Sequence, residues 1–418
     1  MTRSARLRIL GGTAAVVLAT GLGTPAARAA GPARWVAAWT ASSTSSPSDG
    51  AACPARSGLA DATVRNVVFP SAGGDRVRVR LTNVFGDRPL RVGRATVAVR
   101  GAGAALVLGT VRTLRFSGRT GTTVRTGGLV LSDPVALPVQ AGRALAVSVY
   151  LPRATGPATQ HPLALQDGYL ASGDRAGAGS AAAYGTTIDC RLFADAVDVA
   201  PGPRVRGTVV ALGDSITDGA LSTPNTNRRW PDGLARRMQA RHGPVLAVAN
   251  AGISGNEVLK DRVPATFGPS ALHRLDRDVL AQPGVRSVIL LEGINDIGGE
   301  GATGGAIIAG YRQIIARVHA RGARIYGGTL TAFAGSHGQY GGEYGTAFGE
   351  RQRQAVNHWI RTSGAFDGVI DFDRAIADPA DPQRMAPQYD SGDHLHPGDA
   401  GYAAMARAVD INALLRAH

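Results

Sequence analysis

Three residues in the second half of the chain could act together in nucleophilic chemistry. Ser215 lies in the stretch GDSITDG directly after the apolar run VVAL, and Asp393 and His396 lie three positions apart in SGDHLHPGDAGY. A serine hydroxyl becomes an effective nucleophile when a histidine takes its proton and a carboxylate orients that histidine. We therefore predict Ser215 as nucleophile, His396 as base and Asp393 as the group that orients the base.

The same chemistry needs hydrogen-bond donors for an oxygen that becomes negative in the transition state. Gly255 lies in NAGISGN and Asn295 in EGINDIGG. The backbone N–H groups of Ser215 and Gly255 and the side-chain amide of Asn295 are the predicted donors of this oxyanion hole. Glycine at position 255 lets the backbone approach a substrate closely.

Alternating strand and helix patterns are predicted to position these residues. Apolar runs at 208–212, 245–249, 287–291, 324–330 and 368–371 indicate five strands, and the clearest helix is AIIAGYRQIIARVHARG at 306–322. Such a series predicts a mostly parallel sheet with helices on both faces. Function in such sheets collects in the loops after the strands, which is where all of the candidate residues lie.

Each candidate also has an ordinary structural interpretation. Ser215 alone would be a helix cap or turn residue, Asn295 a turn residue, and Gly255 a residue with positive φ. We expect Asp214 and Asp296 to support their loops. Four side chains within seven residues, at positions 390, 393, 394 and 396, could alternatively bind a metal, but no second cluster or H-E-x-x-H helix accompanies them. We therefore expect neither a metal nor a cofactor.

Four blocks in order resemble the SGNH hydrolases, also called GDSL-like lipases and acylhydrolases. They are Gly213-Asp214-Ser215-Ile216, with isoleucine where leucine is commoner, then Gly255, Gly293-Ile294-Asn295-Asp296, and Asp393 to His396. The resemblance implies a three-layer α/β/α, flavodoxin-like catalytic domain at 201–418 with five parallel strands, and the catalytic roles given above. The G-x-S-x-G elbow of ordinary α/β-hydrolases is absent, because Thr217 takes the place of its second glycine.

Residues 30–200 show a different pattern. Alternation in DRVRVRL and RATVAVR, with turns between short runs, predicts an antiparallel β-sandwich or jelly-roll-like domain. Cys53 and Cys190 are predicted to form a disulfide. This half is similar to a secreted two-domain bacterial subfamily of arylesterases and acylhydrolases, some associated with xylan degradation. We expect it either to contact a polysaccharide or to shape one wall of the active-site cleft.

The first 29 residues are predicted to be a secretory signal peptide. Arg3, Arg6 and Arg8 precede an apolar segment at 9–22, and Ala27-Arg28-Ala29 is typical of a cleavage site. No later segment reaches the roughly 18 apolar residues of a membrane span, so we expect secretion without stable membrane insertion. The formal charge of +14 is dispersed and lacks the aromatic interleaving of a nucleic-acid platform, which argues against nucleic-acid binding.

The glycine-rich loop TAFAGSHGQYGGEYG at 331–345 carries Tyr340 and Tyr344. It follows the fourth predicted strand, so the two tyrosines are candidates for a substrate-binding surface, an acyl or sugar subsite; the alternative is a disordered surface loop. The sequence as a whole predicts a secreted serine esterase acting on small-molecule or polymer-linked esters. One alternative is a polysaccharide deacetylating esterase of the acetyl xylan type. Another is a non-catalytic carbohydrate or cell-wall binding protein.

Overall fold

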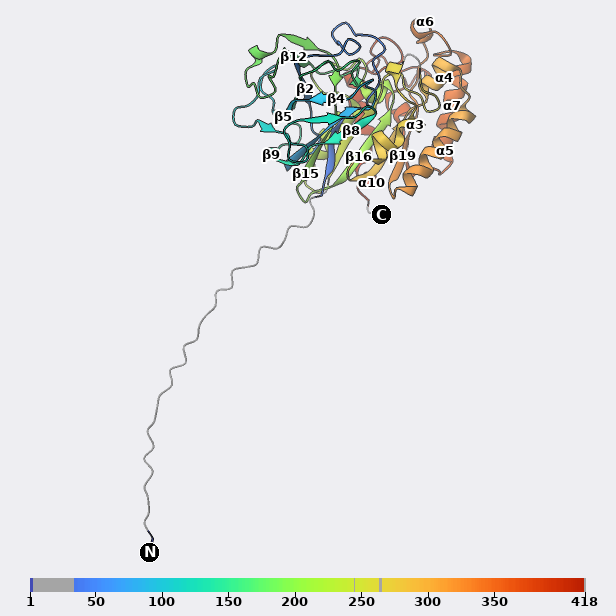
Figure 1. Ribbon diagram of the computed structural model, residues 1–418. Helices are drawn as coiled ribbons and strands as arrows, with labels where there is room; N and C mark the ends of the chain where they lie inside the picture. The colour runs from blue at the N-terminus through green and yellow to red at the C-terminus, as the bar shows by residue number, and fades with distance from the viewer. Residues whose placement is uncertain (3–33, 244, 263–264, 417–418) are drawn as a thin grey trace. The chain divides into compact units, whose positions relative to one another are not determined.

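The structure, a computed structural model, describes residues 1–2, 34–243, 245–262 and 265–416. The predicted signal peptide, apart from its first two residues, lies outside the described part. The chain from Arg34 onward packs as one compact unit. Within this unit a β region, residues 34–201, precedes an α/β region, residues 205–416 (Figure 1).

A sheet of five parallel strands forms the centre of the α/β region, as predicted. Its order is β17-β16-β18-β19-β20. The first strand in sequence, β16, therefore lies inside the sheet beside the edge strand β17, and the chain winds outward from it in both directions, which is the flavodoxin-like arrangement. Residues 209–212 of β16 are all almost completely buried, as expected when helices cover both faces of a parallel sheet. The strands are β16 (Val205–Gly213), β17 (Val245–Gly252), β18 (Val285–Leu291), β19 (Arg324–Gly328) and β20 (Gly368–Ile370).

Helices pack in two groups, one on each face of the sheet. Helix α9 packs against α2 and α8, whereas α5 packs against α3 and α7, and α4 packs against α7. The helix predicted at 306–322 is α5, which Thr303 caps and which buries Ile307, Tyr311 and Ile314 at helical spacing. The longer helices are α2 (Trp230–Gln239), α4 (Ile294–Glu300), α5 (Gly304–Ala320), α7 (Ala347–Thr362) and α9 (Asp399–Ala408). The shorter ones are α1 (Ser215–Asp218), η2 (Ala265–Phe267), α3 (Ala271–Leu275), η3 (Asp276–Leu280), α6 (His337–Tyr340), α8 (Phe372–Ile376) and α10 (Ile411–Leu415).

Antiparallel sheets make up the β region, as predicted. Strand β3 shows why the alternating pattern folds this way: Val77, Val79 and Leu81 are fully buried, whereas the arginines between them are not. One sheet contains β1 (Val36–Thr40), β15 (Ala194–Pro201), β3 (Gly74–Asn83), β8 (Gly128–Leu131) and β9 (Val135–Val139). The other has the order β13 (Thr186–Ile188), β12 (Gly168–Ser172), β2 (Ala62–Val68), β10 (Leu145–Leu151), β5 (Arg94–Val99) and β6 (Arg112–Thr113). Two small ribbons pair β11 (Gln160–His161) with β14 (Arg191–Leu192) and β4 (Leu90–Val92) with β7 (Thr122–Val124); η1 is Ala181–Ala183.

The two cysteines form the predicted disulfide. Cys53 and Cys190 are both buried and their Cα atoms are 5.8 Å apart. The bond joins the loop after β1 to the segment before β14, 137 residues further along the chain. It therefore closes a loop that contains most of the β region.

The β region covers the edge strand β17 of the parallel sheet. The hydroxyl of Thr40 donates to the carbonyl of Asn250 (2.7 Å), and the backbone N–H of Val248 donates to the hydroxyl of Ser71 (2.8 Å). Polar groups of the edge strand are thus satisfied by the neighbouring region, which also shields the edge from other chains.

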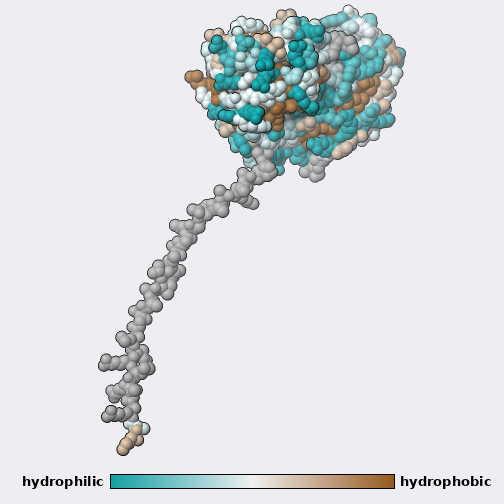
Figure 2. Space-filling view, viewed as in Figure 1, coloured by the Kyte–Doolittle hydropathy of each residue, from teal (hydrophilic) through white to brown (hydrophobic). Residues whose placement is uncertain are grey.

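Two further observations describe the outside of the molecule. Figure 2 shows hydrophilic residues over much of the face in view, with hydrophobic residues in scattered groups. Among the described residues, none of the helices has the length and hydropathy that crossing a membrane requires.

Candidate active site

The candidate nucleophile lies where strand β16 ends. Strand β16 ends at Gly213, and the chain turns into the short helix α1, whose first residue is Ser215. The carboxylate of Asp214 caps this turn by accepting a hydrogen bond from the backbone N–H of Ile216 (2.9 Å). Asp214 therefore supports the local backbone, as expected, and leaves the hydroxyl of Ser215 free for other contacts.

Ser215, His396 and Asp393 form a continuous hydrogen-bonded chain. The Nε2 atom of His396 lies 2.8 Å from the hydroxyl oxygen of Ser215, and its Nδ1 atom lies 2.6 Å from Oδ2 of Asp393. An Nδ1–H that donates to the carboxylate leaves Nε2 as the acceptor, which is the tautomer that can take the proton of the serine. The geometry is that of a nucleophile, a base and an orienting carboxylate.

The carboxylate of Asp393 is held in its ionised form. Burial alone would raise its pKa, but the hydrogen bond and the charge of His396, together with backbone donors, hold the pKa well below its usual range. Its Oδ1 atom accepts from the backbone N–H groups of Leu395 (2.9 Å) and His396 (2.8 Å). One tight turn therefore fixes both side chains.

The turn that carries Asp393 does not directly follow the fifth strand. Helix α8 and the segment from 377 to 392 lie between β20 and this turn. The sequence pattern predicts the turn after the fifth strand without the intervening helix, because the helical run at 372–376 is too short to give a clear periodicity.

Glycine at position 255 is required by its surroundings. Gly255 has a φ of +75°, which favours glycine, and a Cβ atom there would lie 2.3 Å from the ring of Phe267. The loop after β17 therefore presents its backbone without a side chain, as an oxyanion donor at this position requires.

The amide of Asn295 is oriented by two hydrogen bonds. Its Nδ2 atom donates to the carbonyl of Asn256 (2.8 Å), and its Oδ1 atom accepts from the hydroxyl of Tyr344 (2.6 Å). One Nδ2 hydrogen remains for a substrate oxygen. Tyr344 reaches this position because residue 298 is glycine, where a Cβ atom would lie 2.3 Å from the tyrosine ring.

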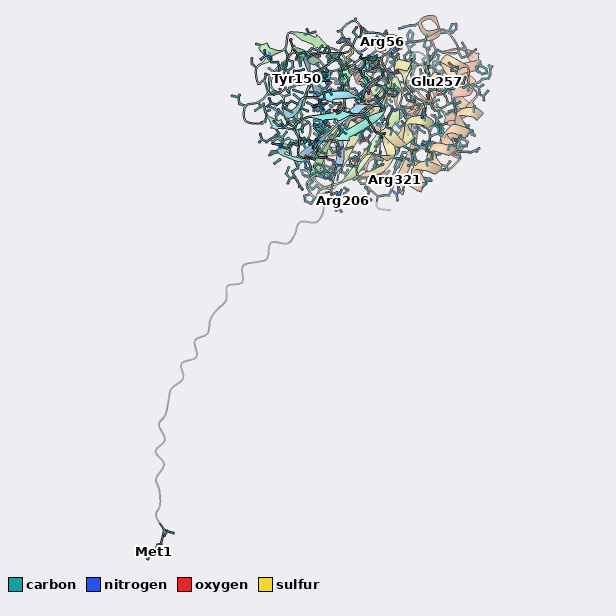
Figure 3. All side chains as sticks on the ribbon, viewed as in Figure 1. Met1, Arg56, Tyr150, Arg206, Glu257 and Arg321 are labelled. Carbon is teal, nitrogen blue, oxygen red and sulfur yellow. A yellow bond between two sulfur atoms is a disulfide. The ribbon has the colours of Figure 1, made fainter. Side chains whose placement is uncertain are left out.

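Hydrogen bonds join the candidate loops into a closed ring. Five successive loops of the α/β region each bond to the next, and the last bonds back to the first, so that each loop is held by two neighbours. The pairs in order are Asp218 with Ser254, Asn256 with Asn295, Asn295 with Tyr344, Tyr340 with Asp393, and His396 with Ser215. Glu257, labelled in Figure 3, follows one of these loops. It lies at the opposite end of the α/β region from Arg206 and Arg321, which lie near the starts of β16 and β19.

The two tyrosines predicted to contact substrate differ in their surroundings. Tyr340 is 38% exposed, its hydroxyl donates to Oδ2 of Asp393 (2.7 Å), and its ring lies 5.9 Å from the ring of His396. Tyr344 is 7% exposed and packs against Tyr340 with its hydroxyl on Asn295. Tyr340 can therefore meet a substrate beside the candidate base, whereas Tyr344 supports the candidate oxyanion donor.

Several carboxyl groups in or beside the candidate loops are buried. Burial raises the pKa of Asp214 to about 7 and that of Asp296 to about 6, and burial with the nearby charge of Asp296 raises the pKa of Glu257 to about 8. Asp296 accepts backbone hydrogen bonds from residues 258 and 259, so it fastens the loop of Gly255 to α4, as expected. Asp214 and Asp296 therefore hold the loops of the site through backbone hydrogen bonds.

The residues considered as metal ligands form two separate pairs. His394 bonds through Nδ1 to Asp390 (2.6 Å), and His396 bonds to Asp393. The only group of three potential ligands that converge in the described part of the chain contains Cys53, Asp189 and Cys190, where the two thiols are joined in the disulfide.

Three supporting residues, Arg274, Asp218 and His161, have no signal in the sequence that would single them out. Arg274 is completely buried and donates to the backbone carbonyl of Gly213 (2.9 Å), just before the nucleophile turn. Asp218 bonds to Ser254 and to His161 of the β region. Each contact joins residues that are distant in sequence, so a local pattern cannot reveal it.

Comparison with known proteins identifies the class to which this site belongs. A model of the GDSL-like lipase/acylhydrolase family matches residues 211–404, the segment that contains every candidate catalytic residue. This part of the chain therefore matches a GDSL-like lipase/acylhydrolase domain, a family that implies ester hydrolase activity. The search of curated proteins finds no match.

Solved structures with similarity to the chain include several of this family. An aryl esterase of M. smegmatis is 15% identical, with 48% of this chain and 95% of that chain covered at a TM-score of 0.40. A carbohydrate acetylesterase of Sinorhizobium meliloti is 14% identical, with the same coverage and a TM-score of 0.39. A GDSL-like lipase of Bacteroides thetaiotaomicron is 17% identical, with 49% of this chain and 85% of that chain covered at a TM-score of 0.36.

Proposed function

We propose that this protein is a serine esterase that hydrolyses carboxylic esters through an acyl-enzyme on Ser215. The observation that carries the proposal is the hydrogen-bonded chain from Ser215 through His396 to Asp393, with distances of 2.8 and 2.6 Å. These distances lie within the range over which a base can take a proton from a nucleophile. The family match of the same segment supports ester hydrolysis as the reaction.

Acylation begins when the hydroxyl oxygen of Ser215 attacks the carbonyl carbon of the ester. Nε2 of His396 takes the hydroxyl proton, and the ester C=O becomes a single bond to a negative oxygen. His396 then returns the proton to the leaving alkoxide as the bond between the acyl carbon and the leaving oxygen breaks. Asp393 keeps the imidazole oriented and stabilises its positive charge.

Deacylation repeats these steps with water as the nucleophile. His396 takes a proton from water, the hydroxide attacks the acyl carbon, and the proton passes to the oxygen of Ser215 as it leaves. In both steps the negative oxygen accepts hydrogen bonds from the N–H groups of Ser215 and Gly255 and from the amide of Asn295. This sequence of steps needs no redox partner, because only protons and the acyl group are transferred.

A panel of p-nitrophenyl esters from acetate to palmitate tests the proposal. Purified protein without residues 1–29 is compared with its Ser215→Ala variant at equal folded concentration. We expect turnover in the unsubstituted protein and a loss of at least about a thousandfold in the variant. A fluorophosphonate probe, which labels an activated serine, is expected to label only the unsubstituted protein. Turnover equal in both proteins would contradict the proposal.

We further propose that the protein is exported. The arginine-rich start and the apolar segment after it support this, as does the disulfide between Cys53 and Cys190, since such bonds persist in oxidising compartments. Expression of the full chain in a secreting host, followed by N-terminal sequencing of the released protein, is expected to give a start near Ala30. A full-length protein retained in the cytoplasm would contradict export.

A further inference from the structure

One histidine of the β region bonds directly to the helix that carries the candidate nucleophile. His161, on strand β11, is 5% exposed, and its Nε2 atom lies 3.0 Å from Oδ1 of Asp218 on α1. Asp218 is 3% exposed and lies three residues after Ser215. The contact therefore buries a titratable pair at the boundary between the two regions, one helical turn from the nucleophile.

The hydrogen-bond partners of His161 indicate its protonation state. Nδ1 lies 2.9 Å from the carbonyl oxygen of Ser42, and Nε2 faces the carbonyl oxygen of Leu163 (3.1 Å) as well as the carboxylate of Asp218. All three partners are acceptors, so each ring nitrogen needs its own hydrogen. A ring with a hydrogen on both nitrogens meets this requirement, and its contact with Asp218 is then a buried ion pair.

The other oxygen of Asp218 reaches the candidate oxyanion loop. Oδ2 accepts hydrogen bonds from the backbone N–H (3.0 Å) and from the hydroxyl (3.2 Å) of Ser254. The next residue is Gly255, whose N–H is one of the proposed oxyanion donors. A single carboxylate thus connects the β region, the nucleophile helix and the oxyanion loop.

Two guanidinium groups lie beside the pair. Arg191 and Arg229 line the same small cavity of about 30 Å³ as His161 and Asp218, with Asp232 as its other carboxylate. Arg229 donates to the backbone carbonyl of Asp218 (2.8 Å) and bonds to the side chain of Asp232. The backbone of Asp218 is therefore held by Arg229, while its two carboxylate oxygens face His161 and Ser254.

We propose that His161 is a positioning residue of the active site, which acts from the β region through Asp218 on the loop that presents the N–H of Gly255. This inference rests on the proposed function. It gives the β region a part in catalysis: its imidazolium holds Asp218 in the orientation in which the carboxylate fixes Ser254. Without that partner, a buried carboxylate turns or protonates, and the oxyanion donor shifts.

The variant His161→Gln tests the proposal, because glutamine keeps a polar side chain but removes the positive charge. Oxyanion donors act on the transition state more than on the bound ester, so kcat should fall while KM changes little. Complete loss of one donor costs about 100- to 1,000-fold in kcat. We therefore expect displacement of the donor to lower kcat for p-nitrophenyl acetate by about tenfold, with KM unchanged within about twofold.

A matched control is Ser71→Ala. Ser71 also makes a buried hydrogen bond between the two regions, to the backbone N–H of Val248 in the middle of β17, away from the candidate loops. Its removal should lower the unfolding temperature and leave kcat at the unsubstituted value. A kcat of His161→Gln equal to that of Ser71→Ala would overturn the proposal.

Two measurements separate positioning from a general loss of structure. If His161 acts through Asp218, the double variant with Asp218→Asn should lose no more activity than Asp218→Asn alone, whereas multiplied losses would overturn the proposal. The second measurement needs no stable variant: ¹⁵N spectra of the unsubstituted protein at pH 7 should show both ring nitrogens of His161 protonated. A neutral ring would overturn the proposal even if the esterase activity of Ser215 is established, and loss of that activity alone would not change the spectra.

Discussion

The hydroxyl of Tyr344 donates a 2.6 Å hydrogen bond to Oδ1 of Asn295. An amide has one acceptor side and one donor side, so this bond fixes the orientation of the Asn295 side chain. The second bond, from Nδ2 to the carbonyl of Asn256, uses one of the two Nδ2 hydrogens. The remaining hydrogen is the one that the mechanism needs, and its direction depends on a tyrosine in the next loop.

Tyr344→Phe should therefore lower kcat without changing substrate affinity. The ring still packs beside Gly298, but the amide of Asn295 can rotate, and we expect kcat to fall by about tenfold with a nearly constant KM. Steady-state kinetics with p-nitrophenyl acetate checks this. In an Asn295→Ala background the tyrosine substitution should have no further effect; an equal additional loss there would show that the hydroxyl does not act through Asn295.

Tyr340 should show separate roles for its hydroxyl and its ring. Tyr340→Phe removes one donor from Asp393, whose Oδ2 atom still accepts from His396, so we expect a change in kcat of less than about tenfold. Tyr340→Ala also removes the exposed ring beside His396, and we expect a KM for aryl esters raised several-fold. Equal KM values in the two variants would contradict contact between this ring and the substrate.

Stability should depend on pH through Asp214. Burial raises its pKa from 3.8 in the unfolded chain to about 7, so the folded protein binds more protons than the unfolded chain between these values. The contribution of this group to the free energy of unfolding is therefore fully present below about pH 4 and is lost as the pH rises to about 7. Oδ2 of Asp214 is buried without a partner, and asparagine can keep the cap on Ile216 through its own carbonyl oxygen.

When the pH is raised from 5 to 8, the free energy of unfolding of Asp214→Asn should consequently fall less than that of the unsubstituted protein. Urea unfolding at the two pH values measures this difference. Asp367→Asn is a matched control, because hydrogen bonds from the backbone and His319 outweigh burial and lower the pKa of Asp367 below 3.8, so the contribution of this carboxylate is constant between pH 5 and pH 8. A fall in stability that is the same in Asp214→Asn and in the unsubstituted protein would contradict the assignment to Asp214.

Removal of the disulfide should destabilise the folded chain. The bond between Cys53 and Cys190 closes a loop of more than a hundred residues, for which chain entropy gives roughly 2 to 5 kcal/mol. The double variant with serine at both positions should unfold at a lower temperature and lower urea concentration. An unchanged unfolding curve for this variant, in the absence of reductant, would contradict a stabilising role.

The sequence was sufficient to predict the elements that have a strong local pattern. Continuous apolar runs gave the five parallel strands, and the spacing of Ile307, Tyr311 and Ile314 gave α5. The residues now joined around Ser215 were found for a related reason: each lies in a short polar segment after a strand, and parallel strands bring such segments to one edge.

Contacts between distant segments could not be predicted in the same way. The bond of His161 to Asp218 spans 57 positions and that of Tyr344 to Asn295 spans 49. Neither the types of these residues nor their spacing is unusual in the sequence. The sequence therefore predicts Tyr344 as a substrate contact, because its loop follows the fourth predicted strand at the edge where the candidate residues lie. Its low exposure depends on glycine at position 298, which only the packing of α4 against this loop makes visible.

The most direct test of the account is the mass of the protein during turnover. Unsubstituted protein is mixed with p-nitrophenyl acetate, quenched in acid within milliseconds to seconds, digested and analysed by mass spectrometry, with Ser215→Ala treated identically. We predict an added acetyl group on the peptide that contains Ser215, absent from the variant, together with loss of hydrolysis in the variant. Hydrolysis that continues undiminished in Ser215→Ala, or an acetyl group that forms only on another residue, would contradict the account.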